Sequence, residues 1–256
     1  MSSPFKKIVF VLDASVSQYD AWSGKTKWEW ITKLFSLNEI FSKFKSSQVG
    51  IVVSGSRHGY AEKNCRDATL LSPMAPFNVT RLRQKLREVT PLGNFSLLKA
   101  LEMAFLQKPQ KIIVLTDGLD ACSFSSDVLE KNKTSLPVID FVVLGKQEKD
   151  QEVFFDEIAK RTSGQVVRME KGEDIHLKIL ELLSIYYQVT RGSTPVLSSP
   201  LDGQTRSLRS GNYTLKIFSV PPAEEISLEI KNGLHHKIEL FVEGQKTLLK
   251  QATNPL

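Results

Sequence analysis

The segment 7–17 has the sequence KIVFVLDASVS, in which five apolar residues precede Asp13 and two serines. A second segment, 111–118, is KIIVLTDG, in which four apolar residues precede Thr116 and Asp117. Short apolar runs of this kind are typical of strands buried on both faces of a parallel sheet. Both acidic motifs therefore follow a buried strand, and ligands of open parallel sheets bind outside the carboxyl ends of strands.

The first 190 residues alternate apolar, β-branched runs with amphipathic stretches, which predicts a Rossmann-like, doubly wound α/β sheet. One interval has no helix between two runs, so it predicts a hairpin and one antiparallel edge strand in an otherwise parallel sheet. The predicted strands are 7–12, 49–53, 68–71, 111–115, 138–144 and 165–168, and the predicted helices are 27–44, 81–89, 97–107, 152–161 and 173–187.

The composition changes near residue 190, where Ser, Thr, Pro and Gly become frequent. This change predicts a first domain at 1–190, a linker at 191–200 and a second domain at 201–256. Beyond the linker, apolar and polar residues alternate with period two, and Asn232 and Gly233 form a favoured tight-turn pair. The second domain is therefore predicted to be a small all-β sandwich, with strands at 213–218, 226–230 and 237–242.

The bulk properties argue against several classes of function. The net charge is +6, but the basic residues Arg81, Arg83, Lys85 and Arg87 are two apart, so they face different sides of a helix, and no aromatic residues lie between them. Nucleic acid is therefore not an expected partner. No apolar run reaches 18 residues and no leader pattern begins the chain, so neither a membrane span nor an export signal is predicted. Phosphate-binding glycine loops are absent, and no enzymatic activity is expected.

The acidic motifs instead suggest a metal site. Asp13, Ser15 and Ser17 alternate, so an extended turn would direct all three side chains toward one point, and Asp117 adds a second carboxylate. Carboxylates and hydroxyls without His or Cys form a hard oxygen set that suits Mg²⁺ or Mn²⁺. The alternative is that Asp13 and Asp117 only cap helices. The presence of both motifs, in this order and after buried strands, favours the metal site.

These motifs resemble the signature of the von Willebrand factor A domain, in which Asp-x-Ser-x-Ser follows an apolar strand. The resemblance covers residues 5–188 and includes the second motif at 114–118. The loops 56–67 and 117–122 are similar to a bacterial branch of the family, which often continues into a small β domain. The sequence SGNYTL at 210–215 resembles the entry of that β domain.

The resemblance implies a non-enzymatic adhesion or protein-interaction module with a metal-ion-dependent adhesion site. Ser15 and Ser17 would contact Mg²⁺ or Mn²⁺ directly, Asp13 and Asp117 directly or through water, and an Asp or Glu of a protein partner would complete the shell. The third motif departs from the family, because Phe95 stands where a metal-binding Thr is usual. That departure implies weaker metal binding, and it favours an alternative function as a metal-independent structural subunit of a bacterial envelope assembly.

Cys65 and Cys122 are the only cysteines in the chain. The loop after the strand at 49–53 leaves the sheet at the same edge as the loop after Asp117, so both cysteines are expected on the metal face. The sequence is consistent with a disulfide between them and with two separate reduced thiols. We favour the disulfide, and with it a periplasmic or secreted location over a cytoplasmic one.

Overall fold

A computed structural model describes residues 5–37, 40, 43–44, 47–118, 122, 127–131, 136–145, 149–201, 205–218, 225–243 and 246–255. The chain divides into two compact units, Met1–Leu180 and Glu181–Leu256.

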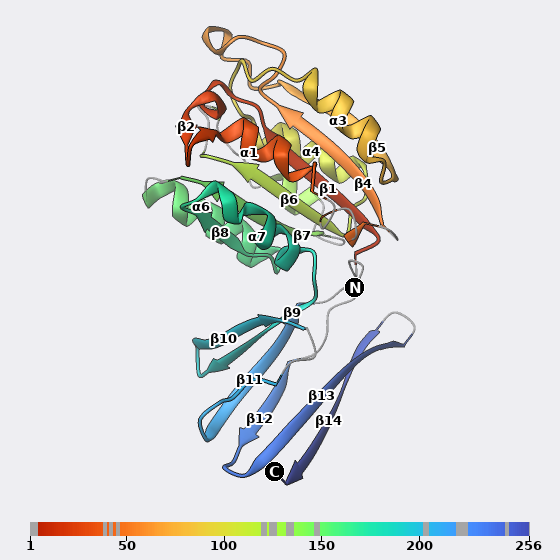
Figure 1. The fold of residues 1–256 in the computed structure, drawn as a ribbon, viewed down its shortest axis with the longest axis vertical. Helices are drawn as coiled ribbons and strands as arrows, with labels where there is room; N and C mark the ends of the chain where they lie inside the picture. Colours follow the sequence, from red (N-terminus) through yellow and green to blue (C-terminus); the bar gives the residue numbers. More distant parts are fainter. Residues whose placement is uncertain are drawn as a thin grey trace. The chain divides into compact units, whose positions relative to one another are not determined.

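A six-stranded sheet in the order β5-β4-β1-β6-β7-β8 forms the centre of the first unit (Figure 1). Five strands are parallel, and β5 pairs with β4 in the antiparallel sense at one edge. The predicted Rossmann-like sheet with one antiparallel edge strand is confirmed. The strands are β1 (Lys7–Asp13), β4 (Gln48–Ser54), β5 (Ala68–Pro76), β6 (Lys111–Thr116), β7 (Val138–Leu144) and β8 (Val166–Met169).

Helices cover both faces of this sheet (Figure 1). Alternate residues of β1 point to opposite faces, so Val9 and Val11 join a core with α4, α5 and α6, whereas Phe10 makes an edge contact with Phe35 at 5.2 Å between ring centroids. The helices are α1 (Lys27–Leu34), α3 (Val79–Arg87), α4 (Leu97–Leu106), α5 (Asp127–Lys131), α6 (Lys149–Arg161) and α7 (Ile175–Leu182). The short elements of this unit are β2 (Ala21–Trp22), β3 (Lys25–Thr26) and the 3₁₀ turns η1 (Val16–Tyr19), η2 (Tyr60–Glu62) and η4 (Gly172–Asp174).

The second unit contains a four-stranded antiparallel sheet in the order β10-β9-β11-β12 and a separate antiparallel hairpin, β13 with β14. The predicted all-β character of this part is confirmed, whereas its description as a sandwich stays a prediction. The strands are β9 (Tyr186–Arg191), β10 (Thr194–Pro200), β11 (Gly211–Phe218), β12 (Ile226–Ile230), β13 (Leu234–Glu243) and β14 (Lys246–Pro255).

The expected linker at 191–200 is wrong. This segment contains the turn at Gly192, which has a φ of +61°, and the strand β10, which pairs with β9. Its prolines are tolerated because β10 is an edge strand. On the side of β10 that faces no other strand of the sheet, a missing backbone N–H removes no hydrogen bond between strands. The predicted helix 173–187 is also too long, since α7 ends at Leu182 and β9 begins at Tyr186. The boundary between the two compact units accordingly falls between residues 180 and 181 of the sequence rather than at residue 190.

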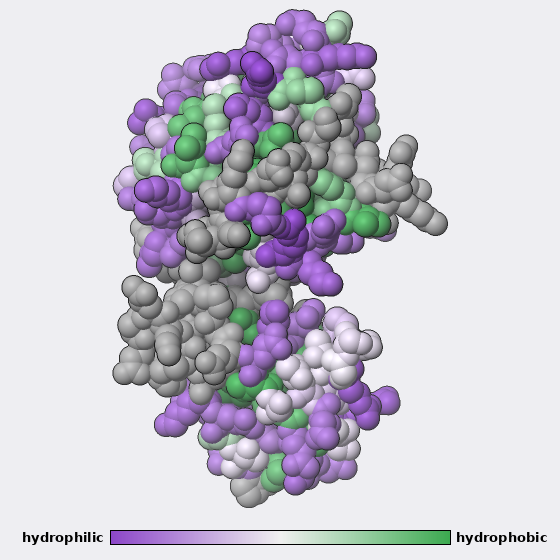
Figure 2. All heavy atoms as spheres, turned by 180° about the vertical axis from the view of Figure 1, so that it is seen from behind, coloured by the Kyte–Doolittle hydropathy of each residue, from purple (hydrophilic) through white to green (hydrophobic). Residues whose placement is uncertain are grey.

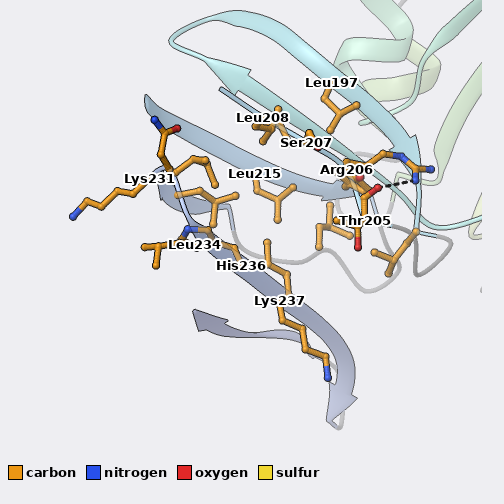
Figure 3. A pocket seen from close by; sticks show the side chains of 18 of the residues that line it. Leu197, Thr205, Arg206, Ser207, Leu208, Leu215, Lys231, Leu234, His236 and Lys237 are labelled. Atoms are coloured by element: carbon orange, nitrogen blue, oxygen red, sulfur yellow. Dashed lines mark hydrogen bonds between the residues drawn. The ribbon is translucent and has the colours of Figure 1, made fainter. Parts of the chain in front are cut away.

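A cavity of about 540 Å³ lies within the second unit (Figure 3). Leu197, Leu208 and Leu215 contribute to its apolar lining, and Lys231 and Lys237 extend outward at its margin in the close-up.

Most large apolar side chains of the described residues are buried. Figure 2 shows hydrophobic patches among hydrophilic side chains on the face that it draws. Single exposed apolar residues are normal on protein surfaces, so only a local cluster of them is informative. The strongly exposed ones are Val16, Tyr19, Tyr60, Leu92, Leu106, Val153, Leu177 and Val196. Within the part of the chain that the structure describes, no helix is both long and apolar enough to cross a membrane.

Candidate metal site

The two acidic motifs meet at one edge of the sheet because β1 and β6 are neighbouring parallel strands. Leu12 pairs with Leu115, so the residues that follow them, Asp13 and Thr116, lie side by side. The Thr116 Oγ1 atom is 2.7 Å from Asp13 Oδ2, and both side chains are buried. Strand pairing alone therefore brings the first aspartate to the second motif.

A local turn directs the serines into the same place. The backbone N–H of Ser15 donates to Asp13 Oδ1 at 2.8 Å, an arrangement that bends the chain just after the strand. The Oγ atoms of Ser15 and Ser17 are 3.0 Å apart, and Ser17 Oγ donates to Asp117 Oδ1, also at 3.0 Å. All four residues predicted from the sequence thus belong to one hydrogen-bonded group.

The spacing of these oxygens fits a small divalent cation. In an octahedral shell with metal–oxygen distances of about 2.1 Å, neighbouring oxygens are about 3.0 Å apart. The Ser15–Ser17 and Ser17–Asp117 oxygen pairs have this separation. Among the described residues no group of three or more His, Cys, Asp or Glu could hold a metal, so a metal here would depend on the serine hydroxyls.

The electrostatics of the group also favour a cation. Burial, and after it the nearby Asp117 carboxylate, raise the pKa of Asp13 to about 7, against the lowering effect of hydrogen bonds from Ser15 and Thr116. A buried, ionised carboxylate beside a second one is unfavourable unless positive charge compensates it. A divalent cation supplies that charge and holds both groups in the ionised form that ligation requires.

One cation is already present in this group, and sequence reasoning missed it. The Nζ atom of Lys27 is 2.5 Å from Asp117 Oδ2, 3.4 Å from the carbonyl oxygen of Ser17 and 3.5 Å from Asp20 Oδ2. The side chains of Lys27 and Asp117 are 13% and 9% exposed, so this ion pair is largely shielded from water. A lysine at the start of a helix is usually solvated, so the sequence carried no signal for this contact.

The third motif borders the site without adding an oxygen from position 95. The ring of Phe95 is 1% exposed and lies in the core that α4, α5 and α6 share with the sheet. The side chains on either side of Phe95 form other hydrogen bonds. The Asn94 side-chain amide donates to the Tyr60 carbonyl at 3.1 Å, and Ser96 Oγ accepts from the Lys99 N–H and caps α4.

Two glycines allow the loops around the site to pack closely. Gly55 has a φ of +89°, and a Cβ atom there would lie 2.9 Å from the Ser15 nitrogen. A Cβ atom on Gly93 would lie 2.2 Å from the His58 carbonyl oxygen. The carbonyl of Gly93 accepts from the Val16 N–H at 3.0 Å, so the third motif directly supports the serine turn.

The loop between β4 and β5 is fixed at two points. Cys65 forms a disulfide with Cys122, and their Cα atoms are 5.5 Å apart. Asp67 is 3% exposed, and its Oδ2 accepts backbone hydrogen bonds from Arg57 at 2.8 Å and His58 at 2.9 Å. Asp67 is a positioning residue that the sequence presented only as part of a loop motif.

Exposed apolar side chains lie on the loops that form and support the candidate site. Val16 lies between the two serines, and Tyr19 ends the 3₁₀ turn that follows them. Leu92 precedes the glycine that binds Val16, and Tyr60 contacts the same loop through Asn94. We call Val16, Tyr19, Tyr60 and Leu92 the apolar rim; their exposed fractions lie between 42% and 58%.

Comparison with known proteins shows similarity at the level of structure only. No family model matches the chain, and no curated protein matches it. A von Willebrand factor type A protein from Catenulispora acidiphila superposes with a TM-score of 0.53 at 12% identity, covering 87% of this chain and 65% of that one. A conserved hypothetical protein, BatB, from Bacteroides thetaiotaomicron gives 0.51 at 16% identity, covering 69% and 96%. Proximal thread matrix protein 1 from the mussel byssus, with a zinc-occupied MIDAS motif, gives 0.52 at 14% identity, covering 73% and 50%.

The first unit therefore has the von Willebrand factor A fold, as the two sequence motifs implied.

Proposed function

We propose that the chain is a non-enzymatic protein-interaction module whose first unit binds a partner through a metal-ion-dependent adhesion site. The observation that carries this proposal is the group of Ser15, Ser17 and Asp117 oxygens at 3.0 Å separations, with the Asp13 carboxylate buried beside it. Mg²⁺ or Mn²⁺ is the expected metal because the donors are hard oxygens. The mussel protein with a zinc-occupied MIDAS motif supports a metal site in this fold.

When bound, the metal supplies a positive centre that attracts a partner's carboxylate. Ser15 and Ser17 hold the two hydroxyl positions, and Asp13 orients their turn through the Ser15 N–H. Phe95 provides no ligand, so the site is partly degenerate and we expect weak metal binding before a partner arrives.

The apolar rim indicates the chemistry of the partner. An acidic side chain in the centre would meet the metal, while apolar or aromatic neighbours cover Tyr19, Tyr60 and Leu92. Interfaces of this kind, with an apolar area around a few polar anchors, gain most of their binding energy from a small number of buried residues. We therefore propose a protein segment in which an Asp or Glu is flanked by apolar residues.

A second candidate is a metal-independent structural subunit of a bacterial envelope assembly. The position of Phe95 in the core favours it, because the third metal contact is then missing. Under this alternative the Lys27 ammonium would neutralise Asp117 permanently. The two candidates differ in whether added metal changes the protein.

We also propose a periplasmic or secreted location. The Cys65–Cys122 disulfide supports it, because such bonds persist in oxidising compartments. The location fits both candidate functions.

Titration with Mn²⁺ and Mg²⁺ tests the metal site. We expect a metal-induced rise in melting temperature that Ser17→Ala abolishes, because a ligand stabilises the state that binds it. Ser36→Ala, an exposed serine after α1, is the matched control and should keep the shift. An equal shift in both variants would reject Ser17 as a ligand. A pull-down then tests the adhesion function. The wild type should capture the same partner with Mg²⁺ but not with chelator, and Ser17→Ala should not capture it.

A further inference from the structure

Lys27 has a fixed position at the start of α1. Thr26 caps the helix, since its Oγ1 accepts from the Glu29 N–H at 3.1 Å and its N–H donates to Glu29 Oε2 at 2.8 Å. The Lys27 N–H also donates to the Asp20 carbonyl at 3.3 Å. Hydrogen bonds therefore hold the backbone of Lys27 in place, and its ammonium contacts Asp117 from the first turn of a helix rather than from a loop.

This position is unfavourable for a cation unless nearby carboxylates compensate it. The first turn of a helix carries a partial positive charge, so acidic residues are preferred there and a lysine is not. Asp117 and Asp20 supply that compensation at 2.5 Å and 3.5 Å. The ammonium is thus held by the same carboxylate that the candidate metal needs.

We infer that Lys27 is a built-in cation of the site, which a divalent metal must displace from Asp117 before it binds. This inference rests on the proposed metal site and explains what compensates the charge of Asp117 without metal. An ammonium and a divalent cation a few ångströms apart repel each other, so the Lys27 ammonium on Asp117 Oδ2 opposes a divalent cation at Asp117 Oδ1. Lys27 therefore lowers metal affinity and sets the metal concentration at which the site opens to a partner.

Asp20 gives the displaced ammonium a second position. Its Oδ2 is already 3.5 Å from Lys27 Nζ, and its side chain is 68% exposed. A change in the outer torsions of the lysine would move the ammonium from Asp117 toward Asp20 and solvent. The exchange conserves charge pairing, because the metal takes Asp117 as Lys27 takes Asp20.

Lys27→Met tests the inference, because methionine keeps an unbranched side chain and removes the charge. Mn²⁺ binding should be measured by calorimetry and by melting temperature for the wild type, Lys27→Met, Lys27→Arg and Lys25→Met. Lys25 is exposed and lies 5.9 Å from the Trp30 ring, so Lys25→Met removes the same net charge without touching Asp117. If Lys27→Met folds poorly, Lys27→Gln serves in its place.

We expect Lys27→Met to bind Mn²⁺ with a dissociation constant lower by about tenfold or more. Without metal it should melt at a lower temperature than the wild type, and with saturating Mn²⁺ it should gain more. Lys27→Arg and Lys25→Met should bind Mn²⁺ like the wild type, and therefore more weakly than Lys27→Met. Asp20→Asn should weaken binding in the wild-type background.

Three results would overturn the inference, and they can be distinguished. If the wild type and Lys27→Met bind Mn²⁺ equally, and Ser17→Ala does not, the metal site stands but Lys27 does not compete for it. If neither the wild type nor Lys27→Met binds Mn²⁺, both the inference and the metal site are rejected. Equal tightening by Lys25→Met would show a general charge effect and would also reject a specific role of Lys27.

Discussion

Cys65 and Cys122 are bonded to each other although they are 57 positions apart in the sequence. The bond joins the loop between β4 and β5 to the chain that follows Asp117, so two loops that border the candidate site are held covalently.

Loss of this bond should destabilise the folded chain. A cross-link of this length restricts the unfolded chain, so Cys65→Ser is expected to lower the free energy of unfolding by about 2 to 4 kcal/mol. Urea denaturation of the oxidised wild type and of the variant measures the difference. Intact-mass analysis with alkylation is the control: two thiols labelled without reductant, on protein made in an oxidising compartment, would contradict the bond itself.

The hydroxyl of Thr116 should matter to both stability and metal binding. Thr116→Val keeps the shape but removes the 2.7 Å contact with the buried Asp13 carboxylate, so we expect a loss of about 1 to 3 kcal/mol in unfolding free energy and weaker Mn²⁺ binding. Thr69→Val is the matched control. The Thr69 hydroxyl is buried without a hydrogen-bond partner among the described residues, so its removal should be neutral or stabilising. Equal losses in the two variants would argue against the Thr116 contact.

A buried ion pair lies outside the candidate site. Lys111 Nζ is 2.5 Å from Asp140 Oδ2, with exposed fractions of 1% and 0%, and burial raises the pKa of Asp140. Lys111→Met leaves an uncompensated buried carboxylate and should cost about 3 to 5 kcal/mol, whereas the double change with Asp140→Leu should cost far less. Denaturant midpoints of the two variants check this. Additive losses would show that the two charges are not coupled.

The apolar rim should contribute to partner binding but not to metal binding. Leu92→Ser is expected to weaken partner binding by about 1 kcal/mol or more, because it removes an apolar contact beside the metal. Leu177→Ser is the control, since Leu177 is similarly exposed on α7, away from the rim. Mn²⁺-induced stabilisation should be unchanged in both. If the two variants bind the partner equally well, the rim is not part of the interface.

Much of the first unit could be predicted because its strands are buried on both faces. Such strands appear as continuous β-branched runs, and the polar residues that end them mark the loops. The pairing of β1 with β6 followed from the fold class, so Asp13, Ser15, Ser17 and Asp117 could be named together from two motifs.

The remainder depended on tertiary contacts that leave weak signals in the sequence. The edge strand β10 has Ser, Thr and Pro because its outer side pairs with no other strand of its sheet, and such a composition is also that of a linker. Ile185 and Tyr187 continue the helical spacing of the apolar residues in α7, but in the structure they pack against the core of the second unit's sheet. The approach of Lys27 to Asp117 joins residues 90 positions apart, and no local pattern encodes it.

A crystal structure of the wild type with saturating Mn²⁺, with anomalous data collected at the manganese edge, tests the central claim most directly. The account predicts one anomalous peak at about 2.1 Å from the Oγ atoms of Ser15 and Ser17, with Lys27 Nζ moved away from Asp117 toward Asp20. Absence of a peak at these hydroxyls, with Lys27 still paired to Asp117 at saturating metal, would contradict it.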